Sequence, residues 1–307
     1  MSESKMYTVS SSPHIRAKEN TQTIMKNVII ALLPAAFAGT YFFKFQAFLV
    51  ILVSILTCVG AEALWQKLAH QKITVTDLSA VVTGLLLAFN LPPSVPLWIP
   101  IVGGFFAIII VKQFFGGLGH NFMNPALAAR AFLLASWPVQ MTTWTLDNVT
   151  SATPLSIMKV GGTQVPPLFN VFIGHVGGCI GETSALALLI GGAYLIFKKV
   201  INWRIPVSFM GTTFLIMCIA GRSMPPIYEL FTGGLMLGAI FMATDYTTSP
   251  ITPTGKIIFG IGCGFITSVI RIWGGYPEGV SYSIILMNLF VPLIDKFLPR
   301  HVFGEGK

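Results

Sequence analysis

The amino-acid sequence predicts an all-α membrane protein with about ten transmembrane helices. Hydrophobic residues make up 54% of the 307 residues and charged residues only 10%, whereas a soluble domain carries about 25% charged residues. The mean hydropathy is +0.76. The apolar residues also gather in ten segments, at residues 24–43, 45–64, 78–93, 97–115, 121–137, 177–197, 205–220, 228–244, 255–273 and 281–298.

Several of these segments are as long as the roughly 20 residues that an α-helix needs to cross a bilayer. The third and fifth segments are shorter, and prolines interrupt them at Pro92, Pro93 and Pro125. The first residues of the chain are polar, and the first apolar run is longer than the apolar core of a signal peptide. We therefore expect no cleavable signal peptide.

Basic residues are distributed unevenly between the two sides of the predicted spans. If the N-terminus is cytoplasmic and all ten segments cross, fourteen basic residues fall on the inner side and four on the outer side. The four outer residues are Lys44, Lys159, Arg222 and Arg271. The positive-inside rule then places both termini in the cytoplasm and the long loop at 138–176 outside the cell membrane.

The two halves of the chain resemble each other weakly. Residues 84–88 match 234–238, and residues 111–117 resemble 270–275, with Lys112 facing inward where Arg271 faces outward. Five spans per half is an odd number, so the halves insert with opposite orientation. The predicted division is a cytoplasmic segment at 1–23, five-helix repeats at 24–137 and 177–298 around the loop at 138–176, and a cytoplasmic tail at 299–307.

Charge and cysteine content exclude several classes of function. The net charge of +8 follows from the predicted topology and from contact with anionic membrane lipid, and the basic residues form no single patch for nucleic acid. The cysteines lack any C-x-x-C spacing, so we expect buried apolar residues rather than ligands of a metal or an iron–sulfur cluster. They are Cys58, Cys179, Cys218 and Cys263.

Two polar runs interrupt the apolar segments. In the first, GGLGHNFMNPA at 116–126, Asn121 and Asn124 offer amide groups beside glycines that permit close approach. In the second, FMATDYTTSP at 241–250, Asp245 lies among threonine hydroxyls, an oxygen-rich setting that suits Na⁺ or a proton relay. Either run is a polar site for a flavin ring or a cation, or serves only to cap helices and form turns.

Four further charged residues fall within or beside predicted spans. A charge at the bilayer centre costs about 2.5–3.5 kcal/mol, so we expect each to face protein, water or the interface. Glu62 and Asp295 lie near span ends and are expected at the interface, whereas Arg130 and Glu182 lie within the fifth and sixth segments.

The long outer loop contains the string DNVTSATPL at 147–155. The pattern D-x-x-[ST]-[GS]-A-T resembles the signal that a flavin transferase reads before it esterifies FMN phosphate onto the last threonine, which here is Thr153. Ser151 and Ala152 are small and leave room for the modifying enzyme. Alternatively, the string is an ordinary loop of small residues.

Together these motifs resemble the RnfD-type membrane subunit of the Rnf complex, an ion-translocating ferredoxin:NAD⁺ oxidoreductase. They resemble less closely the related membrane subunit of the Na⁺-translocating NADH:quinone oxidoreductase. The resemblance runs nearly end to end, from the SSPH start at 11–14 to the YPEGV run at 276–280. It departs from many flavin-attachment sites at Ser151, where those sites have glycine.

The resemblance implies ten helices in two inverted five-helix repeats, similar to urea channels. It implies covalent FMN on Thr153, and a second, noncovalent flavin such as riboflavin, for which Asn121 and Asn124 are the candidate contacts. Asp245 is the candidate ion site. The implied partners are the other Rnf subunits, which carry iron–sulfur clusters and flavins, and a flavin transferase.

The sequence therefore favours an electron-carrying subunit of a translocase, coupled to Na⁺ or H⁺. The alternative is a channel or facilitator for a small neutral solute, which the same scaffold would serve. The flavin motif discriminates between the two, since a channel has no use for it.

Overall fold

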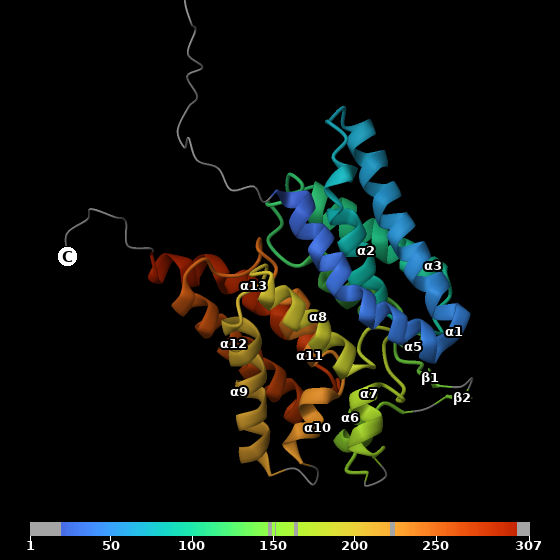
Figure 1. Ribbon diagram of the computed structural model, residues 1–307, viewed down its shortest axis with the longest axis vertical. Helices are drawn as coiled ribbons and strands as arrows, with labels where there is room; N and C mark the ends of the chain where they lie inside the picture. Colours follow the sequence, from blue (N-terminus) through green and yellow to red (C-terminus); the bar gives the residue numbers. More distant parts are fainter. Residues whose placement is uncertain (1–19, 147–148, 151, 163–164, 222–224, 300–307) are drawn as a thin grey trace, which may run out of the picture.

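A computed structural model describes residues 20–146, 149–150, 152–162, 165–221 and 225–299. Within these residues the chain is mainly helical, and its strands form one short hairpin (Figure 1). The helices of the first half are α1 (Thr21–Leu68), η1 (Val75–Asp77), α2 (Ser79–Phe89), α3 (Trp98–Phe105), η2 (Phe106–Gln113) and α4 (Pro125–Ser136). The loop at 138–176 contains α5 (Pro138–Met141), β1 (Thr145–Leu146), β2 (Val149–Thr150), α6 (Pro154–Lys159) and α7 (Leu168–Ile173). The second half contains α8 (Ala185–Phe197), α9 (Arg204–Ala220), α10 (Pro226–Phe231), α11 (Leu235–Leu237), η3 (Gly238–Met242), α12 (Pro253–Trp273) and α13 (Val280–Phe297).

Each of the ten predicted apolar segments contains helix. The first two are joined in α1, which kinks at Lys44, where φ is 59°. Among the described residues, α1, α12 and α13 are long and apolar enough to cross a membrane, by length and composition. The shorter apolar helices are 79–89, 98–113, 125–136, 185–197 and 204–220. The prediction of an all-α membrane protein is thus confirmed in its class.

Helix breaks occur where the sequence supplies the chemistry for them. After α2, the prolines at Pro92 and Pro93 cannot donate a backbone N–H, and the chain runs without helix to α3. Helix α4 begins at Pro125, whose fixed φ suits a first helical position, after the N-cap Asn124. In the second half the eighth apolar segment is divided among α10, α11 and the π-helix η3.

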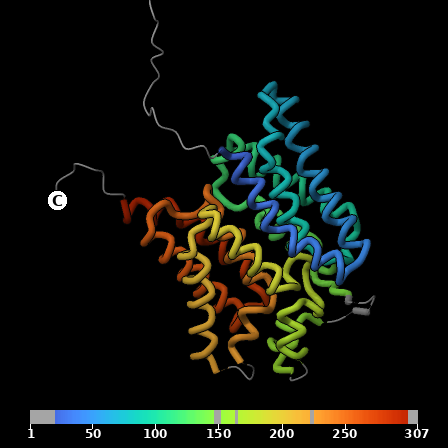
Figure 2. Tube along the Cα trace, in the orientation of Figure 1, coloured from blue at the N-terminus to red at the C-terminus, as the bar shows by residue number. Residues whose placement is uncertain are grey.

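The two halves pack side by side, as Figure 2 shows by the blue-to-green and yellow-to-red parts of the trace. A single cluster of buried side chains extends through both, including Leu32 and Leu87 from the first half and Leu188 and Ile284 from the second. Helix α8 packs on α1. At that contact Gly191 lies so close to the Ala31 carbonyl that an added Cβ would overlap it.

Two buried ion pairs link distant segments. Lys112 at the end of η2 binds the Glu62 carboxylate of α1 at 2.7 Å, and Arg271 at the end of α12 binds Glu229 of α10 at 3.0 Å. All four side chains are at most 4% exposed. The expectation that Glu62 lies at an interface is therefore wrong, because protein encloses its carboxylate. Asp295 is half-buried and accepts the Ile251 N–H.

Candidate functional site

Thr153 is the N-cap of α6, which the sequence explains by the Thr-Pro pair at the helix start. Its hydroxyl accepts the Ser156 N–H at 3.2 Å and donates to the Ser156 hydroxyl at 3.1 Å. Thr153 is 7% exposed, so its side chain is directed into the protein. Of the preceding motif, Asp147, Asn148 and Ser151 lie outside the described residues.

The far end of α6 is held to the second half of the molecule. The Lys159 ammonium donates to the carbonyls of Ile270 at 3.3 Å and Tyr276 at 2.7 Å, and also to that of Gly274. Ile270 belongs to the last turn of α12, where the helix dipole favours a cation. Lys159 therefore fixes α6, and with it Thr153, against the C-terminal end of α12.

Thr153 itself lines only a small cavity of about 20 Å³. A larger cavity, of about 550 Å³, lies near it and shares Glu278 with the small one. We call the larger one the outer cavity. Ala152 and Ser156, on either side of Thr153 in the chain, contribute to its wall. The other lining residues include the aromatic side chains Trp144, Tyr276 and Tyr282, together with Arg130 and Glu278. Its volume lies in the range of about 300–1,000 Å³ that is usual for cofactor and ligand sites.

Arg130 of α4 is the charged centre of this region. One guanidinium nitrogen donates to Asn90 at 2.9 Å and to Glu182 at 3.0 Å, and the other binds Glu278. Arg130 and Glu182 are buried, and the Glu278 side chain is 15% exposed. Since Arg130 comes from the first half and both carboxylates from the second, this buried network ties the halves together at the wall of the outer cavity.

Cys179, Glu182 and Glu278 bring three atoms of metal-ligand type within 4.8 Å of one another. The guanidinium of Arg130 already bonds both carboxylates, and the Cys179 thiol donates to the Asn90 carbonyl at 3.2 Å. The Arg130 guanidinium thus supplies the positive charge that a metal ion would otherwise bring, and the cluster is explained as an ion-pair network.

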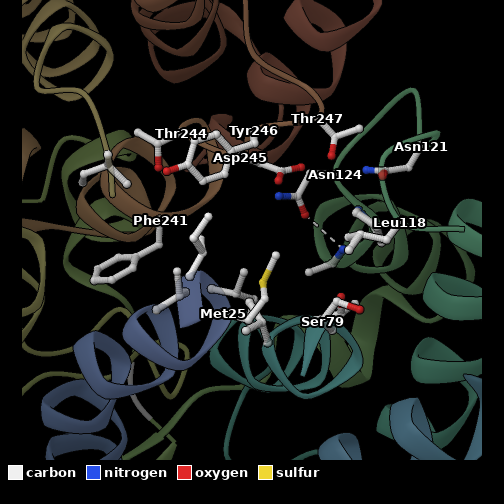
Figure 3. Close-up of a pocket in the computed structure, with 18 of the residues that line it drawn as sticks. Met25, Ser79, Leu118, Asn121, Asn124, Phe241, Thr244, Asp245, Tyr246 and Thr247 are labelled. Atoms are coloured by element: carbon white, nitrogen blue, oxygen red, sulfur yellow. Dashed lines mark hydrogen bonds between the residues drawn. The ribbon is translucent and has the colours of Figure 1, made fainter. Parts of the chain in front are cut away.

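The structure brings Asn121, Asn124 and Asp245 together at a second cavity, which we call the inner cavity (Figure 3). Lys112 and Ser79 also line it. The cavity holds only about 90 Å³, well below the usual size of a ligand site. The proximity of the two polar runs follows from the contact of the two halves, which local sequence does not specify.

Asn124 makes three structural hydrogen bonds through its side chain. Its side-chain oxygen caps α4 by accepting the N–H groups of Ala126 at 3.1 Å and Leu127 at 3.3 Å. Its amide nitrogen donates to the Met242 carbonyl at 3.4 Å, across to the second half. The capping alternative is therefore realised for Asn124. The contact with a flavin stays a prediction.

Asp245 accepts hydrogen bonds from a turn that it organises. The Thr248 hydroxyl donates to its carboxylate at 3.2 Å, and the backbones of Tyr246 and Thr247 and the side chain of Asn121 also donate to it. Burial raises the pKa of the Asp245 carboxyl, against these hydrogen bonds, which lower it. These donors hold the carboxylate in place at the inner cavity. Its role as an ion or proton site stays a prediction.

Sequence reasoning missed Glu278 and Asn90 as partners of Arg130. Glu278 lies 148 residues from Arg130 and Asn90 lies 40 residues from it. The available signal was the need of a buried Arg130 for counter-charge, which identifies that a carboxylate is present but not which one. The sequence likewise predicted that Lys112 faces inward, but it did not identify Glu62 as the partner of Lys112.

Comparison with known proteins matches residues 8–304 to the NQR2, RnfD, RnfE family. The subunit designated D in the Na⁺-translocating ferredoxin:NAD⁺ oxidoreductase complex of Acetobacterium woodii is 56% identical, over 98% of this chain and 96% of that protein. Its counterpart in the proton-translocating ferredoxin:NAD⁺ oxidoreductase complex of Clostridium ljungdahlii is 45% identical, over 98% and 97%. The counterpart in the ion-translocating oxidoreductase complex of Aliivibrio salmonicida is 37% identical, over 97% and 99%.

Proposed function

The chain belongs to the NQR2, RnfD, RnfE family, and from this we propose that it is the flavin-carrying membrane subunit of an Rnf-type ion-translocating complex. In this role it passes electrons between ferredoxin and NAD⁺ together with the other subunits, which bring iron–sulfur clusters and flavins. Two relatives are named for different ions, Na⁺ and the proton, so the proposal covers either ion.

The cofactor that we propose is FMN, joined to Thr153 through a phosphoester. The observation that carries this proposal is the position of Thr153 between Ala152 and Ser156, both of which line the outer cavity of about 550 Å³. A flavin tethered at Thr153 has a chamber of sufficient size next to the chain neighbours of its attachment point.

The lining of the outer cavity fits a flavin chemically. Tyr276, Tyr282 and Trp144 offer aromatic surfaces for a ring system. The Arg130 guanidinium, held by Glu182 and Glu278, forms a fixed polar part of the same wall. FMN supplies one-electron transfer when it is bound. The residues of this chain hold the cofactor, shield it from water and set the charge around it.

Attachment requires that Thr153 be accessible at some stage. Its hydroxyl is bonded to Ser156 and is nearly buried, so we propose that the flavin transferase acts before α6 docks on the second half. After esterification the threonine oxygen can still accept the Ser156 N–H, so the cap of α6 is retained. The donor bond from Thr153 to the Ser156 hydroxyl is the one lost.

A second, noncovalent flavin such as riboflavin, with Asn121 and Asn124 as contacts, remains part of the proposal for the inner cavity. At about 90 Å³ the cavity must widen to take a three-ring system, and Asn124 must keep its capping bonds while it does so. Asp245 remains the proposed ion or proton site of the same cavity.

We also propose ten membrane spans in two inverted repeats, with both termini cytoplasmic and the loop at 138–176 outside. The two buried ion pairs support this arrangement, since Lys112 and Arg271 occupy matched positions in the two halves and each binds a buried glutamate. A cysteine placed at Asn148 should react with an impermeant reagent in intact cells. Labelling only after the membrane is opened would reverse the topology.

The deciding experiment is in-gel fluorescence of the denatured chain, produced in a host that contains a flavin transferase. The native chain should fluoresce under ultraviolet light, and Thr153→Ala should lose the signal completely. Thr143→Ala, which changes another threonine of the same loop and cavity wall, is the matched control and should keep it. An unmodified Thr153 peptide in the active complex, detected by mass spectrometry, would refute covalent attachment.

A further inference from the structure

A third cavity, of about 340 Å³, lies among the end of α8, the start of α9 and the start of α12. We call it the basic cavity. Lys199 and Lys256 line it, together with the polar side chains of Asn202 and Ser249 and the ring of Trp203. Among the described residues, those that line this cavity include no acidic side chain. The site proposed above for flavin and ion transfer makes no use of this cavity.

Further basic residues lie next to the basic cavity in the chain. Lys198 precedes the lining residue Lys199, and Arg204 follows the lining residue Trp203. Asp245, in the neighbouring turn, is directed to the inner cavity and is held there by Thr248. The Tyr246 hydroxyl donates to the Val200 carbonyl and forms part of the wall between the two cavities. The basic cavity therefore attracts an anion that is separate from any ligand of the inner cavity.

Exposed apolar side chains continue from the basic cavity along two adjacent helices. Helices α9 and α12 run side by side (Figure 1). Trp203 and Val207, one turn apart, are each 54% exposed, and Ile257 and Ile261, also one turn apart, are 39% and 46% exposed. An anion that bound here with a hydrocarbon tail would place the tail against these residues.

Trp203 has the properties of a residue at the membrane surface. Its ring is half exposed and carries the Arg204 guanidinium at 5.6 Å from its centre. Tryptophan and basic residues gather where the acyl chains of a bilayer meet the headgroups. The positive-inside rule places Lys198, Lys199, Arg204 and Lys256 on the cytoplasmic side, where anionic lipids give the leaflet a negative surface potential.

We propose that the basic cavity binds the phosphate headgroup of an anionic phospholipid from the inner leaflet, with the acyl chains lying along α9 and α12. Lys199 and Lys256 bind the phosphate, Asn202 and Ser249 offer hydrogen-bond donors, and Trp203 marks the headgroup level. The walls of the cavity include Thr244 and Tyr246, which also line the inner cavity. A bound lipid thus supports the turn that holds Asp245.

The test is native mass spectrometry of the purified complex after delipidation and addition of defined lipids. Phosphatidylglycerol should be retained on this subunit, and zwitterionic phosphatidylcholine should not. Lys199→Gln/Lys256→Gln should weaken phosphatidylglycerol binding about thirtyfold, from the usual contribution of two basic residues. Lys199→Arg/Lys256→Arg keeps the charge and should restore binding.

The matched control is Lys67→Gln/Lys72→Gln, which removes two exposed lysines from the same predicted side of the membrane. It should leave binding within about twofold of the native complex, because a diffuse surface potential falls off over a Debye length. An equal loss in the control and the test variant would overturn the proposal of a specific site. Binding of inorganic phosphate with the same dependence on Lys199 and Lys256 would replace the lipid by a free anion and overturn it as well.

Discussion

The outer and inner cavities are both lined by residues from the two halves of the chain, yet they differ in volume and in how their charged residues are paired. The outer cavity holds about 550 Å³ and is walled by aromatic rings and the Arg130 network. The inner cavity holds about 90 Å³, and its lining combines apolar side chains with Asn121, Asn124 and Asp245. The difference teaches that only the outer cavity has the volume of a ligand site as it stands, whereas the inner cavity must widen to take the second flavin that we propose.

The charged residues around the two cavities also differ in how many partners hold them. Arg130 is bonded by two carboxylates and Asn90, so its position is determined from several directions. Around Lys112 the single carboxylate of Glu62 also accepts from Gln113 at 2.7 Å, and its second oxygen has no hydrogen-bond partner in the described structure. Arg130 in the outer network is thus held by more partners, and Glu62 in the inner pair retains capacity for a further donor.

The largest expected effect is that of Arg130→Met, which removes the centre of the outer network. It leaves Glu182 buried beside Glu278 without counter-charge, so we expect a loss of about 3–5 kcal/mol in stability. The measurement is thermal unfolding of the purified chain. Arg130→Met/Glu182→Gln/Glu278→Gln removes all three charges and should recover part of the loss. No recovery would show that packing, and not charge, holds the two halves here.

Gly191→Val should disturb both cavities at once, because it separates α8 from α1. The new side chain would overlap the backbone carbonyl oxygen of Ala31. Relieving the overlap requires a backbone shift, and overpacking of this kind costs about 1–3 kcal/mol of stability. Gly211→Val in α9 is the control, since its Cβ would meet nothing within 4 Å. Equal melting temperatures for the two variants would contradict the close packing of α8 on α1.

Asn124→Ala tests the inner cavity through its cap. Loss of the bonds to Ala126 and Leu127 should cost about 0.5–2 kcal/mol. Asn124→Ser keeps an N-cap oxygen but loses the amide donor, so it should recover most of the stability. If noncovalent flavin falls in Asn124→Ser while Thr153 fluorescence is kept, the amide contacts the second flavin. Unchanged extractable flavin would leave Asn124 as a cap only.

Asp245→Asn should have the smallest effect on stability and the most specific effect on function. The variant should assemble and keep its flavins, yet lose ion transport coupled to ferredoxin oxidation. Normal transport in the assembled variant would leave Asp245 with the role of organising its turn.

The pH dependence of stability gives a second measurement on Asp245. Burial raises the pKa of its carboxyl, so the native state binds this proton more tightly than the unfolded chain does. The stability that the proton contributes is present at low pH and is lost as pH rises through the folded-state pKa. Asp245→Asn should therefore become more stable relative to the native chain as pH rises above about 4, the ordinary value for an aspartate. A difference independent of pH would contradict the raised pKa.

The amino-acid sequence by itself determined the features that depend on local pattern. Runs of apolar residues specify helices wherever they occur, Asn124-Pro125 and Thr153-Pro154 specify helix starts, and prolines at 92 and 93 end a helix. The motif around Thr153 and the end-to-end resemblance identified the family, which the comparisons confirm. These signals act over one or two turns of chain, or are recognisable in the sequence without any folding.

Only the tertiary structure decided which distant groups meet. Arg130 and Glu278 are 148 residues apart, and Glu62 of α1 binds Lys112 of η2, which packs directly on α1. Hydropathy requires that a buried charge has a partner, but many carboxylates satisfy that requirement equally. Which one does so depends on how α4 packs between the halves. The sizes of the two cavities have the same origin, because they are volumes left by packing, and no segment of sequence encodes them alone.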